Sequence, residues 1–335
     1  MSKDYLKWSK LPYGGEEFPP DNPIDPMAIS WPTYYIKRRG KRFFSPKGLI
    51  RFDLKKPEEI DWDHELTLVK RTLENVTDEQ VKIAKYWGAG AATKQWTPII
   101  DKLIDTYGCT APYAARLLAA VQAGVNDTFV VCWHYKYLWD VARPVQYDIE
   151  MLPILCSPRF PTYPSGHAAV SGCVEVILSY FFPGEAVRLR ELAEENAMSR
   201  LYAGVHFPID NDEGLKLGRR VGEIVVSRLQ EQRDQQYAKI DHPFTEYIGA
   251  DLLPPPYEQA MPYPFKDTCT SNKVCDETRS EEEASEENSF EEELEYVAKK
   301  ELVSEKVLDE RLLEAIPHSR SMPHPVLYIP KPRKR

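Results

Sequence analysis

Three groups of residues between positions 136 and 210 combine cationic side chains with two imidazoles. The first pairs a lysine with an arginine seven positions later, the second is a Pro-Ser-Gly-His run, and the third places an arginine before a histidine and an aspartate. Their members are Lys136 and Arg143; Ser165, Gly166 and His167; and Arg200, His206 and Asp210. Cations, imidazoles, a hydroxyl and a backbone N–H are groups that bind a tetrahedral or trigonal oxyanion. The sequence therefore predicts one oxyanion pocket.

The first group depends on its spacing. On a continuous helix, residues seven apart return to within about 20° of the same face, so Lys136 and Arg143 would project in one direction. Pro144 weakens a helix at Arg143, because the residue before a proline avoids α geometry. Taken alone, the pair could also be two solvated cations on a surface helix.

The second group has the pattern of a helix N-terminus. Ser165 and Gly166 precede a run of apolar residues at helical spacing, which places His167 in the first turn. Free backbone N–H groups at such an end attract anions, and glycine lets an anion approach the backbone closely. His167 would then exchange a proton with the anion. An ordinary capped helix with an incidental histidine is the competing interpretation.

The third group contains a predicted turn. Gly204 is expected to end the helix that carries Arg200, which lets His206 turn back towards that arginine. Asp210 is placed to accept a hydrogen bond from the second imidazole nitrogen and to fix the tautomer. It could instead, or in addition, cap a helix that begins near Asn211.

The elements around these groups read as helices. From Trp62 onwards, apolar residues recur at three- and four-residue spacing, and no alternating strand pattern interrupts them. Helices are expected over residues 62–76, 77–86, 99–108, 110–136, 166–181, 185–200 and 211–229. The sequence predicts an all-α helical bundle with an irregular N-terminal arm and a C-terminal extension.

Composition divides the chain into four parts. Residues 1–60 are rich in proline and aromatic residues and are predicted to wrap on the main body, with disorder as the alternative. Residues 61–238 form the helical catalytic domain, and residues 239–275 a Pro-rich irregular segment. Residues 276–335 form an acidic tail that is partly helical or disordered. Its amphipathic helix, Glu291 to Ile316, could bind a protein partner, pair with a second copy of the chain, or only solubilise it.

Composition also limits the partners. Of the net charge of −9, residues 276–295 supply −10, with eleven acids and one base, so the rest of the chain is close to neutral and shows no nucleic-acid-binding face. No apolar run reaches the ~18 residues of a membrane span, and the N-terminus lacks a signal peptide, so a cytoplasmic protein is expected. The six scattered cysteines are expected to be free thiols.

Read together, the three groups resemble a known signature. The patterns K-x6-R-P, P-S-G-H and S-R-x5-H-x3-D, in this order, are similar to those of the type-2 phosphatidic acid phosphatase superfamily. That superfamily contains bacterial acid phosphatases, lipid phosphatases and vanadium-dependent haloperoxidases. The resemblance spans residues 136–210 and says little about residues 1–60 or 240–335.

The resemblance implies a role for each residue. The equatorial oxygens of the oxyanion would be held by five groups: Lys136, Arg143, Arg200, Ser165 and the amide of Gly166. His206 would be the axial group, either the nucleophile of a phosphatase or the ligand to vanadium in bound vanadate. His167 would be the general acid or base, and Asp210 would orient His206. These roles are chemically consistent, because an oxyanion-like transition state needs fixed positive charge around it and an imidazole in line.

Two aromatic residues separate the candidate reactions. Trp133 and Phe160 match positions that resemble the halide site of chloroperoxidases, although both could be ordinary core residues. They favour a haloperoxidase-like enzyme that uses vanadate as cofactor and peroxide to oxidise halide. The alternatives are a phosphatase without a cofactor, acting through phospho-His206, and a non-catalytic anion-binding or scaffold protein acting through its tail. The extra carboxylate that supports the lysine in haloperoxidases is not located in this sequence.

Overall fold

A computed structural model describes residues 4–263 of the 335-residue chain. The acidic tail, the helix expected over 291–316 and the last residues of the Pro-rich segment lie outside the described residues.

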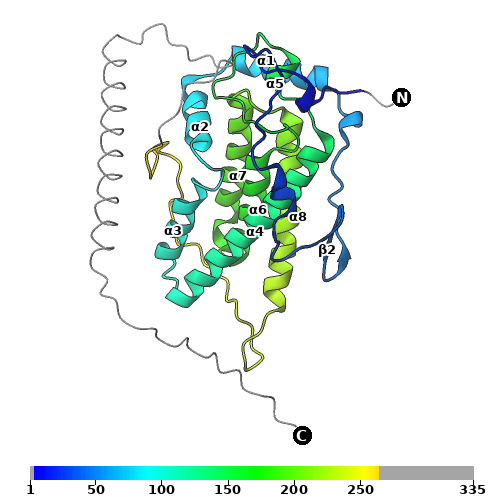
Figure 1. Cartoon of the computed structure of the whole chain (residues 1–335). Helices are drawn as coiled ribbons and strands as arrows, with labels where there is room; N and C mark the ends of the chain where they lie inside the picture. Colours follow the sequence, from blue (N-terminus) through cyan, green and yellow to red (C-terminus); the bar gives the residue numbers. More distant parts are fainter. Residues whose placement is uncertain (1–3, 264–335) are drawn as a thin grey trace, which may run out of the picture. The chain divides into compact units, whose positions relative to one another are not determined.

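The described residues form a helical bundle, so the predicted all-α class is confirmed (Figure 1). Helix α6 contacts α8, α7 and α4, and α2 packs on α7. The α-helices are α1 Trp62–Glu74, α2 Asp78–Gly88, α3 Trp96–Thr106, α4 Ala111–Trp139, α5 Pro144–Tyr147, α6 Gly166–Phe181, α7 Ala186–Tyr202 and α8 Pro208–Glu231. Short 3-10 turns occupy η1 Trp8–Lys10, η2 Pro26–Ser30, η3 Pro57–Glu59 and η4 Pro183–Glu185.

Several helix ends follow the sequence signals. Thr77 and Gln80 form the expected capping box at α2, with reciprocal side-chain to backbone hydrogen bonds of 3.0 and 3.2 Å. Ser165 caps α6 by accepting a hydrogen bond from the backbone N–H of Ala168 at 3.4 Å. Gly108 follows α3 with φ +59°, a conformation that favours glycine. These local predictions are confirmed, because each depends on residues within one turn of the helix end.

The structure decides whether Lys136 and Arg143 share a helix, and it corrects one predicted helix boundary. Helix α4 ends at Trp139, where Asp140 takes a left-handed conformation with φ 55°, and Arg143 is the N-cap of the separate helix α5. Lys136 and Arg143 therefore do not share a helix, because the chain turns between them. Helix α8 begins at Pro208 rather than near Asn211, and Asp210 lies in its first turn rather than at its N-cap.

Helices α6 and α8 approach each other closely along a row of glycines. A Cβ atom built on Gly218 would lie 1.8 Å from the backbone oxygen of Ala169, and one on Gly214 would lie 2.6 Å from that of Ser165. No side chain fits at either position, so glycine is what permits the two backbones to meet. This contact brings the start of α6 beside the start of α8, where the amide of Ser165 donates to the carbonyl of Asp210 at 2.8 Å.

The N-terminal arm packs on the helices and contains a small sheet. Its strands are β1 Lys37–Arg39, β2 Arg42–Ser45 and β3 Gly48–Leu49, antiparallel in the order β1-β2-β3. The sequence analysis did not anticipate this sheet, because its strands are too short to show an alternating pattern. Trp8, Tyr13, Ile36 and Phe43 of the arm are each buried.

A buried carboxylate on α4 holds the arm in place. Asp127 is inaccessible to solvent, and it accepts backbone hydrogen bonds from Tyr34 at 2.8 Å, Tyr35 at 2.7 Å and Ile36 at 3.0 Å. Burial raises the pKa of Asp127, whereas these three N–H groups stabilise the charged form. The arm is thus fixed by an interaction between residues some ninety positions apart in sequence.

The free-thiol expectation holds for some cysteines only. Cys109, Cys132 and Cys173 are free, but Cys156 is disulfide-bonded, which corrects the expectation for that residue. The positions of cysteines in the sequence do not show which of them are oxidised, which explains the error. None of the described helices combines the length and apolar character that crossing a membrane requires.

We expect Asp127→Asn to loosen the arm, because the new amide NH₂ would face the backbone N–H groups that the carboxylate now accepts. The free energy of unfolding, measured by urea denaturation, should fall by about 2 kcal/mol. Asp101→Asn changes an exposed aspartate on α3 and serves as the matched control, with no measurable loss. Equal stability of the two variants would contradict the role given to Asp127.

Candidate functional site

A cavity of about 580 Å³ lies between the helices and the arm. One end is polar and is lined by Gly166, His167, Arg200 and His206. The remaining wall is largely apolar and includes Trp133 and Phe160. Lys136, Arg143, Ser165 and Asp210 do not line the cavity themselves; hydrogen bonds and short contacts connect them to the residues that do.

The imidazole of His206 is held by Asp210, which lies in the first turn of helix α8. Its Nδ1 lies 2.8 Å from Oδ2 of Asp210, which also accepts the backbone N–H of Phe207 at 3.0 Å. On the opposite side of the ring, Nη1 of Arg143 lies 3.1 Å from Nε2. Because a guanidinium can only donate, Nε2 accepts this hydrogen bond and Nδ1 carries the proton. The lone pair of Nε2 is therefore directed towards the arginine and the cavity.

Thr162 joins this pair as a third member. Its hydroxyl donates to Oδ2 of Asp210 and lies 3.1 Å from Nδ1 of His206. Burial raises the pKa of Asp210 to about 7, whereas the Thr162 hydrogen bond and the charge of Lys136 act in the opposite direction. Three donors converge on one oxygen of Asp210, which is the environment of a carboxylate rather than of a carboxylic acid.

Arg143 is fully buried and only partly satisfied. Its Nε donates to the carbonyl of Phe160 at 2.9 Å and its Nη1 to that of Val205 at 2.8 Å, whereas Nη2 is buried without a partner. Burial lowers the pKa of Arg143, and Tyr13 and Asp210 partly offset this. A buried guanidinium N–H without an acceptor is costly, so it marks a place for an additional acceptor.

Lys136 is supported by carbonyl groups. Its Nζ is buried and donates to the backbone oxygens of Pro161 at 2.9 Å and Thr162 at 2.7 Å. These carbonyls occupy the supporting position for which the sequence showed no carboxylate. Burial lowers the pKa of Lys136 to about 7. A nearby anion would offset this effect of burial and stabilise the ammonium form.

Arg200 reaches the cavity from α7. Its Nη2 donates to the carbonyl of Ala84 at 2.8 Å and its Nε to the hydroxyl of Ser199 at 3.0 Å. A Cβ atom at Gly88 would lie 3.1 Å from both Nη atoms, so glycine at the end of α2 leaves room for the guanidinium. Burial lowers the pKa of Arg200 to about 9. The predicted turn at Gly204, with φ +73°, brings His206 to the same cavity.

His167 lies in the first turn of α6, as predicted. Its Nε2 is buried and has no hydrogen-bond partner. Burial holds the pKa of His167 well below its usual range, and Arg200, Lys136 and Arg143 lower it further. The imidazole is thus neutral, and an anion placed among these cations would favour its protonation. His206 has a similarly low pKa for the same reasons, burial first and the charge of Arg143 next.

Charge does not balance in this cluster. Lys136, Arg143 and Arg200 contribute three buried cations, and Asp210 is the carboxylate beside them. Uncompensated buried charge is strongly destabilising. A di- or trianion at the polar end would neutralise the excess, accept from Nη2 of Arg143, and accept from Nε2 of His167 once that nitrogen is protonated. The five predicted cationic and imidazole residues are thus brought together by the structure around a place that suits an oxyanion.

Two aromatic rings cover the cations. Trp133 and Phe160 lie with ring centroids 4.8 Å apart, and the Phe160 ring faces both Lys136 Nζ at 5.0 Å and the guanidinium of Arg143 at 4.8 Å. Cations over aromatic faces are stabilised most where water is excluded. These rings therefore form a wall of the site and are not isolated core residues.

The residues that sequence reasoning missed act mostly through the backbone. Carbonyls of Ala84, Pro161, Thr162 and Val205 accept from the three cations. A carbonyl carries no signal of residue type, so no pattern could have identified them. Thr162 was the exception that could have been found, because a hydroxyl residue stands three positions before Ser165.

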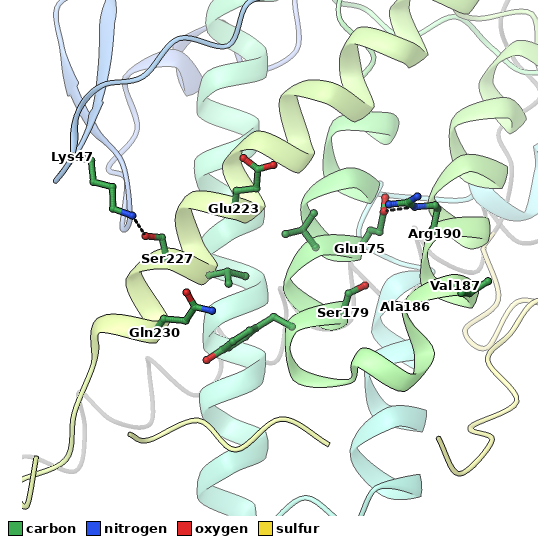
Figure 2. Close-up of a pocket in the computed structure, with 12 residues that line it drawn as sticks. Lys47, Glu175, Ser179, Ala186, Val187, Arg190, Glu223, Ser227 and Gln230 are labelled. Carbon is green, nitrogen blue, oxygen red and sulfur yellow. Dashed lines mark hydrogen bonds and ion pairs between the residues drawn. The ribbon is translucent and has the colours of Figure 1, made fainter. Parts of the chain in front are cut away.

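A larger groove of about 890 Å³ lies elsewhere, over α6, α7 and α8 (Figure 2). In this groove Lys47 donates to Ser227 at 2.8 Å, and Arg190 pairs with Glu175 at 3.3 Å. It contains none of the predicted site residues. The smaller cavity is therefore the candidate functional site.

Fold and geometry define the class of protein first: a helical bundle with buried cations and imidazoles gathered at the start of α6 and α8. Comparison with family models then shows that residues 114–234 match the PAP2 superfamily. This match confirms the resemblance predicted from residues 136–210. No curated protein matches the sequence.

Solved structures share the fold. A bacterial vanadium-dependent iodoperoxidase matches with a TM-score of 0.55 and 22% identity over 69% of this chain, which spans 62% of that protein's length. A bacterial vanadium-dependent chloroperoxidase has a TM-score of 0.47 and 18% identity. The match covers 62% of this chain and 55% of the length of that protein. A transmembrane PAP2-type phosphatidylglycerolphosphate phosphatase from Bacillus subtilis has a TM-score of 0.42 and 17% identity. The match covers 52% of this chain and 88% of the length of that protein. The first of these shows the shared fold.

Thr162→Val should disturb the tautomer of His206. Without the hydroxyl, Asp210 loses one of three donors to Oδ2, its pKa rises further, and its hold on Nδ1–H weakens. We expect ¹⁵N NMR of the histidine ring to show a larger fraction protonated at Nε2. Thr162→Ser keeps the hydroxyl and should behave like the unchanged protein. Identical ring spectra for all three proteins would refute this role.

Oxyanion affinity should depend on pH with a defined sign. An anion raises the lowered pKa values of Lys136 and His167, so binding takes up protons, and affinity must fall as pH rises through 7. Sulfate remains a dianion across this range, so calorimetric titration with sulfate from pH 5.5 to 8.5 isolates the protein's contribution. The loss should approach about tenfold per pH unit for each proton taken up. Constant affinity would contradict the assigned pKa shifts.

Proposed function

We propose that the protein is a vanadium-haloperoxidase-like enzyme that uses peroxide to oxidise halide in this pocket. The observation that supports it best is the pair of buried, unpartnered nitrogens, Arg143 Nη2 and His167 Nε2, beside three buried cations and under an aromatic wall. A tetrahedral or trigonal-bipyramidal oxyanion satisfies every one of these groups. The fold shared with an iodoperoxidase is in keeping with this proposal.

The residues present fit vanadate. Nε2 of His206 offers an unprotonated nitrogen as ligand, and its Nδ1–H is fixed by Asp210. Arg143, Arg200, Lys136 and the N–H of Gly166 would hold the oxygens, with Ser165 at the same helix N-terminus. When bound, vanadate supplies the Lewis-acid centre at which peroxide becomes a two-electron oxidant of halide.

The chain's own residues provide the rest of the chemistry. His167 is neutral in the free site, so it can accept a proton from peroxide and later return one. Trp133 and Phe160 exclude water, and a weakly hydrated halide enters such an apolar region more readily than a strongly hydrated ion. Asp210 and Thr162 keep Nδ1 protonated, which preserves the lone pair of Nε2 throughout.

A phosphatase is the second candidate, and the His206 geometry favours it. Nε2 is unprotonated, so it can attack the phosphorus of a phosphomonoester once Arg143 Nη1 donates to the bound phosphate instead of to this nitrogen. The N–P bond would form as the ester P–O bond breaks, with His167 giving a proton to the leaving oxygen once the bound anion has raised its pKa. Water would then release phosphate from His206. This chemistry needs no cofactor.

One set of assays separates the two. Protein incubated with orthovanadate should give a bound ⁵¹V NMR signal and should form triiodide from iodide and hydrogen peroxide. His206→Ala should lose both the signal and at least about a hundredfold in rate, whereas His64→Ala, an exposed histidine on α1, should lose neither.

Parallel assays use p-nitrophenyl phosphate without vanadate. Halide oxidation absent at every vanadate concentration, together with phosphate release that requires His206 and is inhibited by vanadate, would replace the first proposal with the second. Absence of both activities in the unchanged protein would exclude both proposed functions.

A further inference from the structure

The small sheet of the N-terminal arm and the segment that follows it concentrate positive charge. Residues 37–56 contain nine basic residues and one acidic residue, Asp53, in a chain whose net charge is negative. The sheet lies on the outside of the bundle beside α8, where Lys47 donates to Ser227 at 2.8 Å (Figure 1). The arm therefore places a basic surface on one side of the helical body.

Strand register sorts the side chains of the sheet onto two faces. Residues directly opposite one another in neighbouring strands project to the same face. Arg38 is opposite Phe43, whose buried ring meets that of His134 at 5.3 Å, so this face packs on the body. The other face points outwards and carries three exposed cations and two apolar side chains: Lys37, Arg39, Arg42, Phe44 and Leu49.

Two arginines of the outward face stand directly opposite each other. Arg39 faces Arg42 across the hairpin, and like charges in this position destabilise a sheet. Within residues 4–263, neither arginine nor Lys37 takes part in an ion pair. Charges on an edge strand also prevent pairing with other chains, but either sign achieves this. A face that carries cations alone, at a cost in stability, indicates an anionic partner.

The apolar side chains of this face distinguish between anionic partners. Phe44 is opposite Lys37 on one side and Leu49 on the other, so the apolar residues lie among the cations, and Leu49 is 48% exposed. The backbone of a nucleic acid offers phosphates to the cations but no apolar region to a leucine. A membrane offers both, because apolar side chains enter the acyl boundary while cations stay with anionic headgroups.

The hairpin is held in this position before any partner binds. Arg38, on the inner face, donates to the carbonyl of Gly40 at 2.9 Å and to that of Ile29 in the η2 turn. The amide of Ile50 donates to the carbonyl of Phe43 at 2.8 Å and continues the pairing beyond β3. Little backbone ordering is then required on binding, which lowers its entropic cost.

We propose that the outward face of this sheet docks the protein on an anionic membrane surface. Its cations lie at the level of the lipid phosphates, and Leu49 and Phe44 enter between the headgroups. The docking surface belongs to the arm, outside the residues that match the PAP2 superfamily, and it acts independently of the reaction in the cavity. Salt weakens the docking, because exposed charges are screened.

Sedimentation of the full chain with lipid vesicles tests the docking. The unchanged protein should bind vesicles of equal parts phosphatidylcholine and phosphatidylglycerol, and should not bind phosphatidylcholine alone. Arg39→Glu combined with Arg42→Glu should weaken binding at least about a hundredfold. Lys82→Glu combined with Lys85→Glu makes the same change in net charge on α2, away from the sheet, and should bind like the unchanged protein. Equal affinities for the two double variants would overturn the proposal.

A substitution of Leu49 separates a membrane from a nucleic acid. Leu49→Gln removes an apolar side chain without changing charge, so it should weaken vesicle binding about tenfold. Vesicle binding that does not depend on Leu49 would overturn the membrane assignment. Tighter binding to duplex DNA than to the anionic vesicles, lost in the arginine variant, would assign the face to nucleic acid instead.

Two further measurements keep the test decisive. Lys37→Glu combined with Lys41→Glu alters other exposed cations of the hairpin, and it should lose vesicle binding in the same way if the arginine variant does not fold. Calorimetry with sulfate should give the same affinity for every folded hairpin variant, because the cavity is unchanged. A parallel loss of sulfate and vesicle binding would place the lipid contact in the cavity and refute the docking face. Vesicle binding needs no turnover, so failure of the proposed function leaves this test intact.

Discussion

The structure depends on the burial of three cations beside one carboxylate. Removing an ammonium or guanidinium group from water costs several kcal/mol, and this cost is tolerated only where other groups replace the lost hydration. Here backbone carbonyls provide most of the replacement: those of Pro161 and Thr162 at Lys136, those of Phe160 and Val205 at Arg143, and that of Ala84 at Arg200. What the carbonyls leave unmet, above all Nη2 of Arg143, is what an oxyanion would meet.

This requirement explains the arrangement of the surrounding chain. A carbonyl can accept from a buried cation only if its segment is held in place, so the loop from Phe160 to Thr162 must be fixed at both ends. The amide of Thr162 bonds to Val141 at 3.0 Å, and Ser165 at the start of α6 bonds to Asp210 on α8 at 2.8 Å. Close approach of α6 and α8 at Gly214 and Gly218 makes the second contact feasible. The packing of the bundle therefore fixes the carbonyl groups that stabilise the buried cations of the site.

Sequence reasoning succeeded where the cause is local and failed where it is not. The capping of α6 by Ser165, the first-turn position of His167 and the carboxylate partner of His206 could be predicted, because each depends on residues within one helical turn. The route from Lys136 to Arg143 could not, since the αL turn at Asp140 is stabilised by distant contacts, including a hydrogen bond from the arm residue Ser9. Carbonyl acceptors, the bridge at Cys156 and the small sheet of the arm leave equally little trace in residue type or spacing.

Burial of the cations and the apolar wall reinforce each other. Aromatic rings over Lys136 and Arg143 lower the local dielectric response, which lowers the pKa of Lys136 and also strengthens its attraction for an anion. A small, strongly hydrated anion gains this attraction but gives up its water without contacting the rings. The same wall that excludes water from the cations therefore also strengthens their attraction for an anion.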